Sequence, residues 1–363
     1  MSKVKIFLVF VLACAIGIIM AGCASKPAST GTSSTSGGKN YVIGFSNSYN
    51  GNSLRQEEES AFKTAADQLI QEGQIGSYTI VESNNNSETQ AAQIENLVLK
   101  HVSAIVLDPG SPTALNGAIA KAQAANIPVI VINDGPVTTT YSYQLINDSA
   151  AVSRDTTLWM IKQMGGKGNV LILRGIAGTS YDIDSYNATM DVINQYPGIK
   201  VVGTVYCNWT DSVAQTAVAN ILPSLPRVDG IVGQGGDEYG AAQAFIAAGR
   251  PIPVITGGNR GNYLNWWIQE SAQNPKFVSF SECDDPSFGV AGLYLAVDIL
   301  NGVKVPQNMI YPNLTITQAD LPKYAAMHMS NSDVAMSSPT QQSIRQNIES
   351  EPPADLSKYL PTS

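Results

Sequence analysis

The chain has 363 residues, of which 44% are hydrophobic and 14% are charged, a composition typical of a soluble globular protein. Its formal net charge of −8 argues against a nucleic-acid-binding protein, because phosphates favour surfaces rich in Lys and Arg. The length leaves room for one large domain or two medium ones behind an N-terminal signal.

The N-terminal residues are predicted to form an export signal. Lys3 and Lys5 precede an apolar run from Ile6 to Met20, which is too short to span a membrane comfortably, and small residues then lead to Cys23. This ending resembles the lipobox of bacterial lipoproteins, in which the cysteine is acylated. We therefore expect a lipoprotein signal peptide over residues 1–22 and a membrane anchor on Cys23. Ordinary secretory cleavage beside an incidental cysteine is the alternative.

The next segment is predicted to be a flexible tether. Residues 23–40 are rich in Ser, Thr and Gly, and such a segment cannot bury enough apolar surface to fold. An anchored protein of this kind would be exported and held at the outer face of the bacterial cell membrane or in the periplasm.

The first half of the body alternates between strands and helices. Strands are predicted at residues 41–45, 78–81, 104–107 and 128–132, and helices at 60–72, 90–100 and 113–125. The run at 128–132 is continuously apolar, which indicates a strand buried on both faces. This alternation predicts a parallel sheet covered by helices on both sides.

The same alternation begins again after residue 148. Helices are predicted at 149–164, 186–196, 212–222 and 239–248, and strands at 169–173, 200–205, 230–233 and 252–255. The predicted fold class is therefore α/β, with two similar lobes. In such sheets ligands bind beyond the carboxyl ends of the strands, so the loops after these strands are the candidate site.

Seven segments of the body carry a resemblance to one family. In order and sequence they are similar to the ribose-binding-protein type (type I) of periplasmic substrate-binding proteins, the receptors of sugar ABC transporters; the segments are 43–47, 93–97, 104–109, 125–132, 165–173, 196–202 and 298–306. The resemblance covers about residues 41–325. It implies two Rossmann-like lobes with parallel sheets, joined by a three-strand hinge.

The resemblance also implies how the chain divides between the lobes. The N-terminal lobe is expected over residues 41–146 plus 282–310, and the C-terminal lobe over 147–281 plus 311–325. Crossings are expected near 145–148, 281–283 and 311, with a closing strand at 314–317 in the second lobe. Residues 326–363 are expected to be a weakly ordered tail, with a docked C-terminal strap as the alternative.

The function that the resemblance implies is capture by closure. The two lobes swing about the hinge and enclose a polar ligand, and no bond is made or broken. The implied ligand is a sugar or polyol, delivered by a monomeric protein without cofactor or metal to an ABC permease and ATPase complex. Sugar hydroxyls are bound by Asp, Asn, Gln and Arg, and the apolar faces of the ring stack on aromatic side chains.

Candidate ligand-binding residues in the first lobe follow its first and fourth strands. The first loop offers Asn47, Tyr49 and Arg55, and Arg55 can grip two oxygens or pair with a nearby Glu. One branch of the family has a Trp before this Arg, where this chain has Leu. The fourth loop offers Asn133 and Asp134, of which the second reverses the charge of the Arg that many relatives use and argues against ribose itself. A turn without ligand contact is the alternative there.

Candidate residues in the second lobe follow its strands in the same way. Asp182 and Asp184 flank Ile183, which stands where relatives present an Arg, and either Asp can instead cap the helix that begins there. Trp209 is a candidate ring platform, with ordinary packing as the alternative. The remaining candidates match family positions in the loops and the hinge; they are Asp237, Asn259 and Glu282.

These departures reduce the ionic capacity of the pocket relative to a pentose receptor. Arg is replaced by Asp134 and Ile183, and the Asn and Asp of the family by Gly236 and Asn259. The sequence therefore predicts a neutral sugar, polyol or sugar-like molecule as the ligand.

Two cysteines remain in the body, Cys207 and Cys283. In an exported chain they can form one disulfide or stay as two buried thiols, and the sequence leaves both open.

Other classes of protein fit the sequence less well. A repressor of the related fold would carry a helix-turn-helix where this chain has an export signal. A hydrolase would need a nucleophile and base, but neither His101 nor His328 has a triad companion, and no metal-ligand spacing is present. A receptor that feeds a membrane sensor in chemotaxis or two-component signalling remains open beside the transport receptor.

Overall fold

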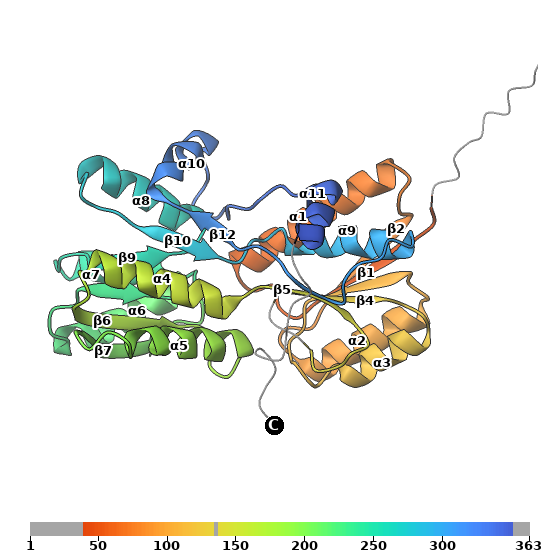
Figure 1. The fold of residues 1–363 in the computed structure, drawn as a ribbon, viewed down its shortest axis with the longest axis horizontal. Coiled ribbons are helices and arrows are strands. Elements are labelled where there is room, and N and C mark those ends of the chain that lie inside the picture. Colours follow the sequence, from red (N-terminus) through yellow and green to blue (C-terminus); the bar gives the residue numbers. More distant parts are fainter. Residues whose placement is uncertain (1–38, 134–136, 351–363) are drawn as a thin grey trace, which may run out of the picture. The chain divides into compact units, whose positions relative to one another are not determined.

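The computed structural model describes residues 39–133 and 137–350, which form two α/β lobes, each built on a six-stranded sheet (Figure 1). This arrangement confirms the predicted fold class. The signal peptide, Cys23, most of the tether, Asp134 and residues 351–363 lie outside the described residues. Among the described helices, none combines the length and the apolar character needed to cross a bilayer.

The first sheet has the strand order β11-β5-β4-β3-β1-β2, and all its neighbouring strands are parallel. Its strands and covering helices are β1 Val42–Asn47, α1 Ser53–Gln71, β2 Ser77–Glu82, α2 Ser87–Leu99, β3 Ala104–Leu107, α3 Asn116–Ala124, β4 Val129–Asn133, β5 Tyr143–Ile146, α9 Phe288–Leu300 and β11 Asn308–Ile310. Alternate strand residues point to opposite faces. Val106 and Ile132 pack with α1 and α9, whereas Ile105 and Val131 pack with α2 and α3.

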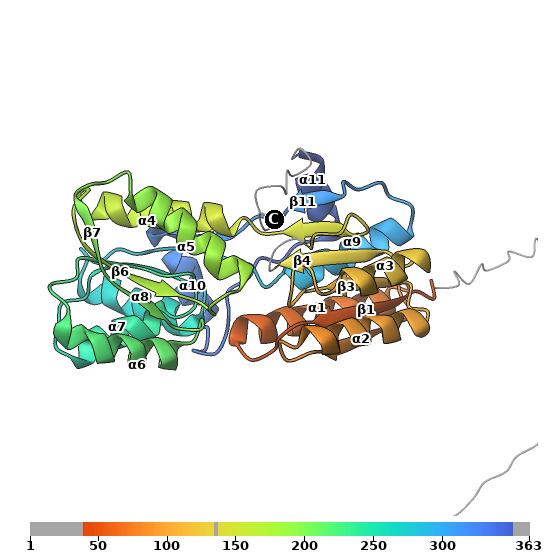
Figure 2. The same cartoon turned by 90° about the horizontal axis from the view of Figure 1, so that it is seen from below.

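The second sheet has the order β12-β10-β9-β8-β6-β7, and only β12 is antiparallel to its neighbour. Its elements are α4 Ser149–Gln163, β6 Gly168–Arg174, α5 Ser180–Ile193, β7 Ile199–Tyr206, α6 Asp211–Ile221, β8 Gly230–Val232, α7 Glu238–Ala247, β9 Val254–Gly257, α8 Gly261–Gln273, β10 Phe280–Cys283, β12 Leu314–Ile316 and α10 Leu321–Met327. Helices α4 and α5 pack on one face of this sheet, and α6, α7 and α8 pack on the other (Figure 2).

The chain passes between the two sheets at three connections. They join β5 to α4, β10 to α9, and β11 to β12. One edge strand of each sheet, β11 in the first and β12 in the second, therefore comes from a later part of the sequence than the strand beside it.

Residues 328–350, which belong to the expected tail at 326–363, contact both lobes. Val334 forms an antiparallel bridge with Arg260 in the second lobe. Helix α11, Gln341–Ser350, then packs on α9 of the first lobe, where Ile344 is 1% exposed in the core and Arg345 forms an ion pair with the buried Asp298. We refer to residues 330–345 as the C-terminal strap.

Candidate functional site

Residues from both lobes line one cavity of about 230 Å³ at the carboxyl ends of the strands. The strand order reverses at β1 in the first sheet and at β6 in the second, and such switch points form ligand crevices in open α/β sheets. The lining residues are Tyr49, Asn52, Leu54, Arg55, Asn85, Gly110, Asn133, Ile176, Thr179, Tyr181, Trp209, Gln234, Gly235, Arg260 and Asp284.

A buried polar cluster forms the first-lobe wall. Arg55, which is 5% exposed, has its Nη1 3.2 Å from Glu58 Oε2 and also forms an ion pair with Asp108 at the end of β3. Asn133 donates its Nδ2 to Glu58 Oε2 at 3.5 Å. Its Oδ1 is buried without a hydrogen-bond partner among the described residues, so it can accept a bond from a bound molecule.

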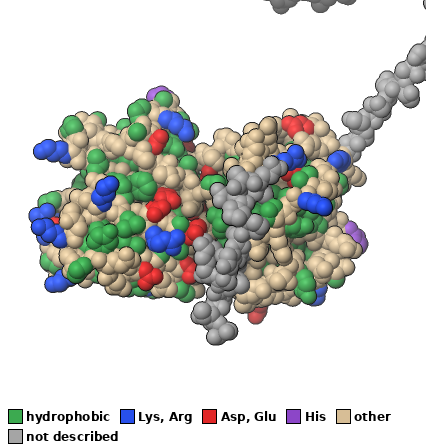
Figure 3. All heavy atoms as spheres, viewed as in Figure 1, with side chains coloured by type: hydrophobic (Ala, Val, Ile, Leu, Met, Phe, Trp, Pro, Cys, Tyr) green, Lys and Arg blue, Asp and Glu red, His purple; other side chains and the backbone are tan. Residues whose placement is uncertain are grey.

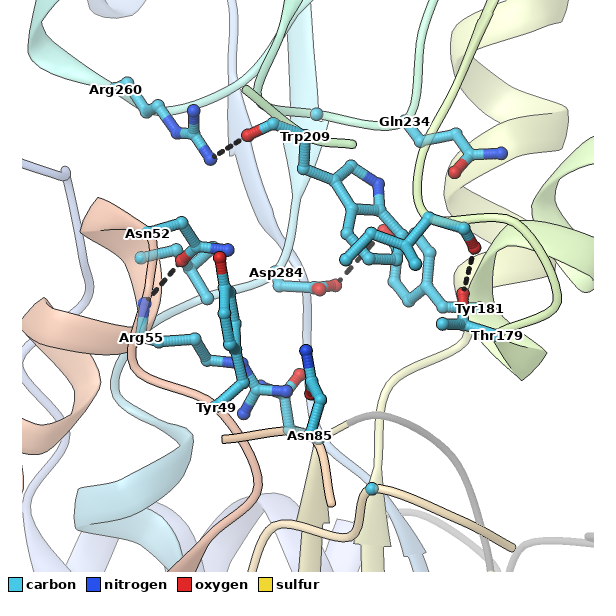
Figure 4. A pocket seen from close by; sticks show the side chains of 15 residues that line it. Tyr49, Asn52, Arg55, Asn85, Thr179, Tyr181, Trp209, Gln234, Arg260 and Asp284 are labelled. Carbon is cyan, nitrogen blue, oxygen red and sulfur yellow. Dashed lines mark hydrogen bonds between the residues drawn. The ribbon is translucent and has the colours of Figure 1, made fainter. Parts of the chain in front are cut away.

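Two aromatic side chains form the second-lobe wall. The rings of Tyr181 and Trp209 are 5.7 Å apart and perpendicular. Figure 4 shows these two rings, together with Tyr49 and Asn85 of the first lobe, around the same space. Aromatic faces and amides on opposing walls can contact the apolar and polar surfaces of one small molecule.

Arg260 brings a second cation to the cavity, from the residue before α8. Its Nη2 donates to Trp209 O at 2.9 Å, and its Nη1 donates to Gly236 O. Burial, and then the charge of Glu238, hold the pKa of the nearby Asp237 well above its usual range, and the charge of Arg260 opposes this shift. The two hydrogen bonds to backbone carbonyls fix the position of the Arg260 guanidinium at the cavity.

Asp284 lies in the connection between β10 and α9. Its Oδ1 accepts bonds from Asn147 Nδ2 at 2.5 Å and from the Tyr181 hydroxyl at 3.4 Å. One carboxylate thus bonds to the β5–α4 connection and to the aromatic wall of the second lobe.

The structure places four of the residues suggested by the sequence on the cavity wall; they are Tyr49, Arg55, Asn133 and Trp209. Arg55 forms the ion pair with Glu58 that one interpretation expected, and it also lines the cavity, so its contact with a ligand stays a prediction. Asp134 lies outside the described residues.

The other suggested residues lie off the wall. Asp182 is fully buried and accepts two bonds from Arg174, at 3.0 and 2.6 Å, because that arginine ends β6 directly opposite the first turn of α5. Asn47 is also fully buried, and its Oδ1 accepts from the Tyr49 N–H. Asp184, Asp237, Asn259 and Glu282 also lie off the wall of this cavity.

Several wall residues were not identified from the sequence. Asn52, Asn85, Thr179, Gln234 and Arg260 all follow strands, but nothing in their local pattern distinguishes them from ordinary loop and helix-cap residues. Asn52 and Thr179 do cap α1 and α5, since their side chains accept bonds from backbone N–H groups in the first turn.

The two body cysteines are free and buried. Burial raises the pKa of the Cys207 thiol and of the Cys283 thiol, which makes both unreactive. The structure therefore matches the alternative of two buried thiols. In the part of the chain that the structure describes, no group of three or more His, Cys, Asp or Glu side chains is arranged to hold a metal ion.

Comparison with known proteins identifies the family. The sequence profile of the periplasmic binding protein domain matches residues 43–304. The chain belongs to this family of periplasmic binding proteins. Such proteins act outside the cytoplasm and bind solutes without transforming them, so the chain is a binding protein and not an enzyme.

Individual relatives of this periplasmic binding protein include proteins named for a polyol, for a sugar and for an ABC transporter. A xylitol-binding protein of Mycolicibacterium smegmatis is 29% identical over 239 residues, which is 65% of this chain and 67% of the relative. The ribose import binding protein of Bacillus subtilis is 22% identical over 306 residues, 83% of this chain and 95% of the relative. A solved ABC transporter solute binding protein from Thermobispora bispora is 33% identical and has a TM-score of 0.79. The match covers 87% of this chain and 98% of the solved chain.

Replacing Gly175 by alanine is expected to weaken ligand binding by at least tenfold. A Cβ atom at this position would lie 2.0 Å from the Trp209 ring, so the ring must leave its place on the wall. Titration calorimetry measures the effect. Gly117→Ala is the matched control, because a Cβ there has no atom within 4 Å and binding should not change. Equal affinities of the two variants would contradict the assigned wall.

A pH dependence of stability is expected from Glu282 in β10. Burial first, and then the carboxylates of Asp155 and Asp148, raise its pKa from 4.5 to about 7. The folded state therefore holds this proton more tightly than the unfolded state, and the associated stability is complete below pH 4.5 and is lost as the pH rises towards 7. Because the side chain is partly exposed and therefore screened by water, we expect a loss of only about 1 kcal/mol.

Urea unfolding at acid and neutral pH measures this loss, and Glu282→Gln should remove most of it. Glu95→Gln, at an exposed ion pair with Lys121, is the control and should keep the pH dependence of the native chain. If the stability of the Glu282→Gln protein still fell by the full amount between acid and neutral pH, the pH dependence would arise from other groups.

Proposed function

We propose that this protein is the solute receptor of an ABC importer and that it captures a neutral sugar or polyol. The observation that carries the proposal is the cavity with an amide and arginine wall on one lobe and an aromatic wall with a second arginine on the other. Planar polar groups suit hydroxyls, and aromatic faces suit the C–H faces of a sugar.

The charges at the cavity support a neutral ligand. Arg55 is balanced by the carboxylates of Glu58 and Asp108. Arg260 already donates to the backbone carbonyls of Trp209 and Gly236, and Asp284 adds a carboxylate to the wall itself. An anionic ligand would have to compete with these groups for both guanidinium groups, and a neutral polyol would not.

The relatives support the same class of ligand, since xylitol and ribose are both neutral polyhydroxy compounds with five carbons. We infer that the ligand is of this size or slightly larger, and that it sits between Asn133 and Arg55 on one side and Trp209 and Tyr181 on the other.

Capture would proceed by a hinge motion about the three connections between the sheets and about the C-terminal strap, which also runs from one lobe to the other. A ligand that contacts both walls binds the closed arrangement better than the open one, and this difference alone shifts the population towards closure. The hydrogen bonds of Asp284 are expected to change during this motion, because its carboxylate bonds to Asn147 and to Tyr181.

We also propose that the mature protein is a monomeric lipoprotein anchored through Cys23, and that it hands its ligand to a permease and ATPase complex. Support comes from the export signal, the small residues before Cys23 and the Ser/Thr/Gly-rich tether that follows. Labelling of expressing cells with a palmitate analogue should mark the native chain and not Cys23→Ser. A labelled Cys23→Ser chain, or an unlabelled native one, would overturn this part.

Titration calorimetry against a panel of pentoses, hexoses, pentitols, nucleosides and sugar acids tests the ligand class. The expected result is micromolar or tighter binding of one neutral sugar or polyol at one site per chain. Binding of a sugar acid alone, or of a nucleoside alone, would refute the proposal.

The second candidate function is a receptor that feeds a membrane sensor. A fructose-binding periplasmic domain of a hybrid two-component system shares the fold, with a TM-score of 0.67 at 18% identity. Because both functions use the same fold and the same kind of cavity, the measurement that separates them is uptake: deletion of the gene should abolish accumulation of the labelled ligand in the transport case and leave it intact in the sensor case.

A further inference from the structure

The C-terminal strap pairs with the loop that carries Arg260. The Ala335 N–H donates to Asn259 O at 2.8 Å, and the Gly261 N–H donates to Asp333 O at 2.7 Å. Between these bonds Val334 and Arg260 form an antiparallel bridge. The segment that presents Arg260 to the cavity is therefore held by a short stretch of sheet-like pairing with residues far along the chain.

Asn259 is the side chain at which three segments meet. It is 1% exposed, and its Nδ2 donates to Ala335 O at 2.8 Å and to Asp284 O at 3.0 Å. Asn259 does not line the cavity. Its neighbour in sequence, Arg260, and its hydrogen-bond partner, Asp284, both do. One buried amide thus ties the strap to two wall residues.

The other end of the strap is fixed to the first lobe. The Ser337 N–H donates to the carboxylate of Asp285, with both oxygens at 3.1 Å, and Ser337 Oγ lies 2.9 Å from Ser287 Oγ. Beyond these residues, Arg345 Nε donates to Asp298 Oδ2 at 2.7 Å. The strap therefore runs from the second lobe, across the β10–α9 connection, to α11 beside α9 in the first lobe (Figure 1).

We propose that the strap is part of the ligand site without touching the ligand, and that Asn259 is its positioning residue. By ordering the Arg260 loop and Asp284 in the free protein, the strap removes part of the conformational entropy that binding would otherwise cost. This inference rests on the proposed function, because the affinity it predicts is that for a sugar or polyol.

The substitution Asn259→Asp tests the positioning role. Aspartate has nearly the same shape, and it is the residue that the family resemblance places near this position. If Asn259 contacts the ligand, the carboxylate should keep or improve binding. If Asn259 positions the site, the lost Nδ2 donor and the repulsion from the Ala335 and Asp284 carbonyls should weaken binding of xylitol or D-ribose by about tenfold.

Asn265→Asp is the matched control. The Asn265 Nδ2 also makes two bonds to this end of the chain, to Met329 O and to Asn331 Oδ1, both at 3.0 Å, but Asn265 lies in α8 away from the cavity wall. Its substitution should change affinity by less than twofold. Equal effects of the two substitutions, or tighter binding by Asn259→Asp, would overturn the proposal.

A shortened chain that ends at Ser332 completes the test. It keeps the bonds of Asn265 and removes Asp333, Val334 and Ala335, so it should bind about tenfold more weakly, and Asn259→Asp should add less than threefold in that background. Unchanged affinity of the shortened chain would refute the role of the strap. Should the shortened chain fail to fold, the two Asn substitutions in the full chain still decide.

Hydrogen exchange separates this inference from the proposed function. In the ligand-free protein, the amides of residues 257–262 should exchange faster in Asn259→Asp than in Asn265→Asp. That measurement needs no ligand. If no sugar or polyol binds the native chain, the proposed function fails, and the exchange rates alone then support or refute the positioning of the loop.

Discussion

Replacing Arg260 by methionine is expected to weaken ligand binding by about a hundredfold, the largest effect of any single substitution at the site. Methionine has a similar length but no donors, so the ligand loses a charged partner, and Trp209 O and Gly236 O lose theirs. The loop that carries Trp209 should loosen as a result. Lysine should restore only part of the affinity, because one ammonium cannot span both carbonyls and a ligand in the manner of a planar guanidinium.

Arg250→Met is the control for this experiment. Arg250 also lies in the second lobe and also donates to backbone carbonyls, those of Leu222, Leu225 and Pro226, but it does not line the cavity. Its loss should lower stability and leave affinity unchanged. If calorimetry found the two arginine variants equally impaired in binding, the role of Arg260 at the site would be refuted.

Replacing Trp209 by alanine is expected to weaken binding by about thirtyfold or more, since Trp209 is the largest aromatic side chain on the second-lobe wall. Phenylalanine should recover much of the loss, because stacking needs a flat apolar face more than the indole N–H. Ligand should also change the intrinsic fluorescence of the native chain, and this change should be greatly reduced in Trp209→Phe.

Trp159→Phe serves as the comparison for the fluorescence experiment. Trp159 stacks on Phe280, with ring centroids 5.7 Å apart, and does not line the cavity. A ligand-dependent fluorescence change that survives in Trp209→Phe and disappears in Trp159→Phe would place the ligand elsewhere.

The two-lobed fold could be predicted from the sequence because most of the buried strands are short apolar runs and most of the covering helices have an apolar side. The helix starts were less accurate. Helix α1 begins at Ser53 and not at residue 60, because the Asn52 side chain caps it, and α5 begins at Ser180 because Thr179 does the same. Helix α9 was not assigned, since nearly all its residues are buried and the one-sided pattern of a surface helix is missing.

The candidate site could be predicted where a polar or aromatic residue directly follows a regular strand. Asn133 ends β4 and Trp209 follows β7, and both lie on the wall. In the irregular loop after β9 the family pattern points to Asn259, but the structure turns Asn259 to the strap and Arg260 to the cavity. A one-residue difference of this kind depends on contacts with residues 333–335, which no local pattern contains.

The surface agrees with a protein that binds a small solute. On the face seen in Figure 3, Lys and Arg are dispersed among acidic and neutral side chains and form no continuous basic stripe of the kind that tracks nucleic acid. The polar and aromatic groups suited to binding a small solute line the cavity, whose walls come from both lobes.

Mass spectrometry of the ligand carried by the protein tests the central claim most directly. The native chain is incubated with an equimolar panel of neutral and acidic sugars and polyols, separated from free solute, and denatured to release what it holds. The account predicts one neutral sugar or polyol, chemically intact, at no more than one molecule per chain, and its loss in the Arg260→Met and Trp209→Ala proteins. Recovery of a converted product, of a sugar acid alone, or of the same ligand from both variants would contradict it.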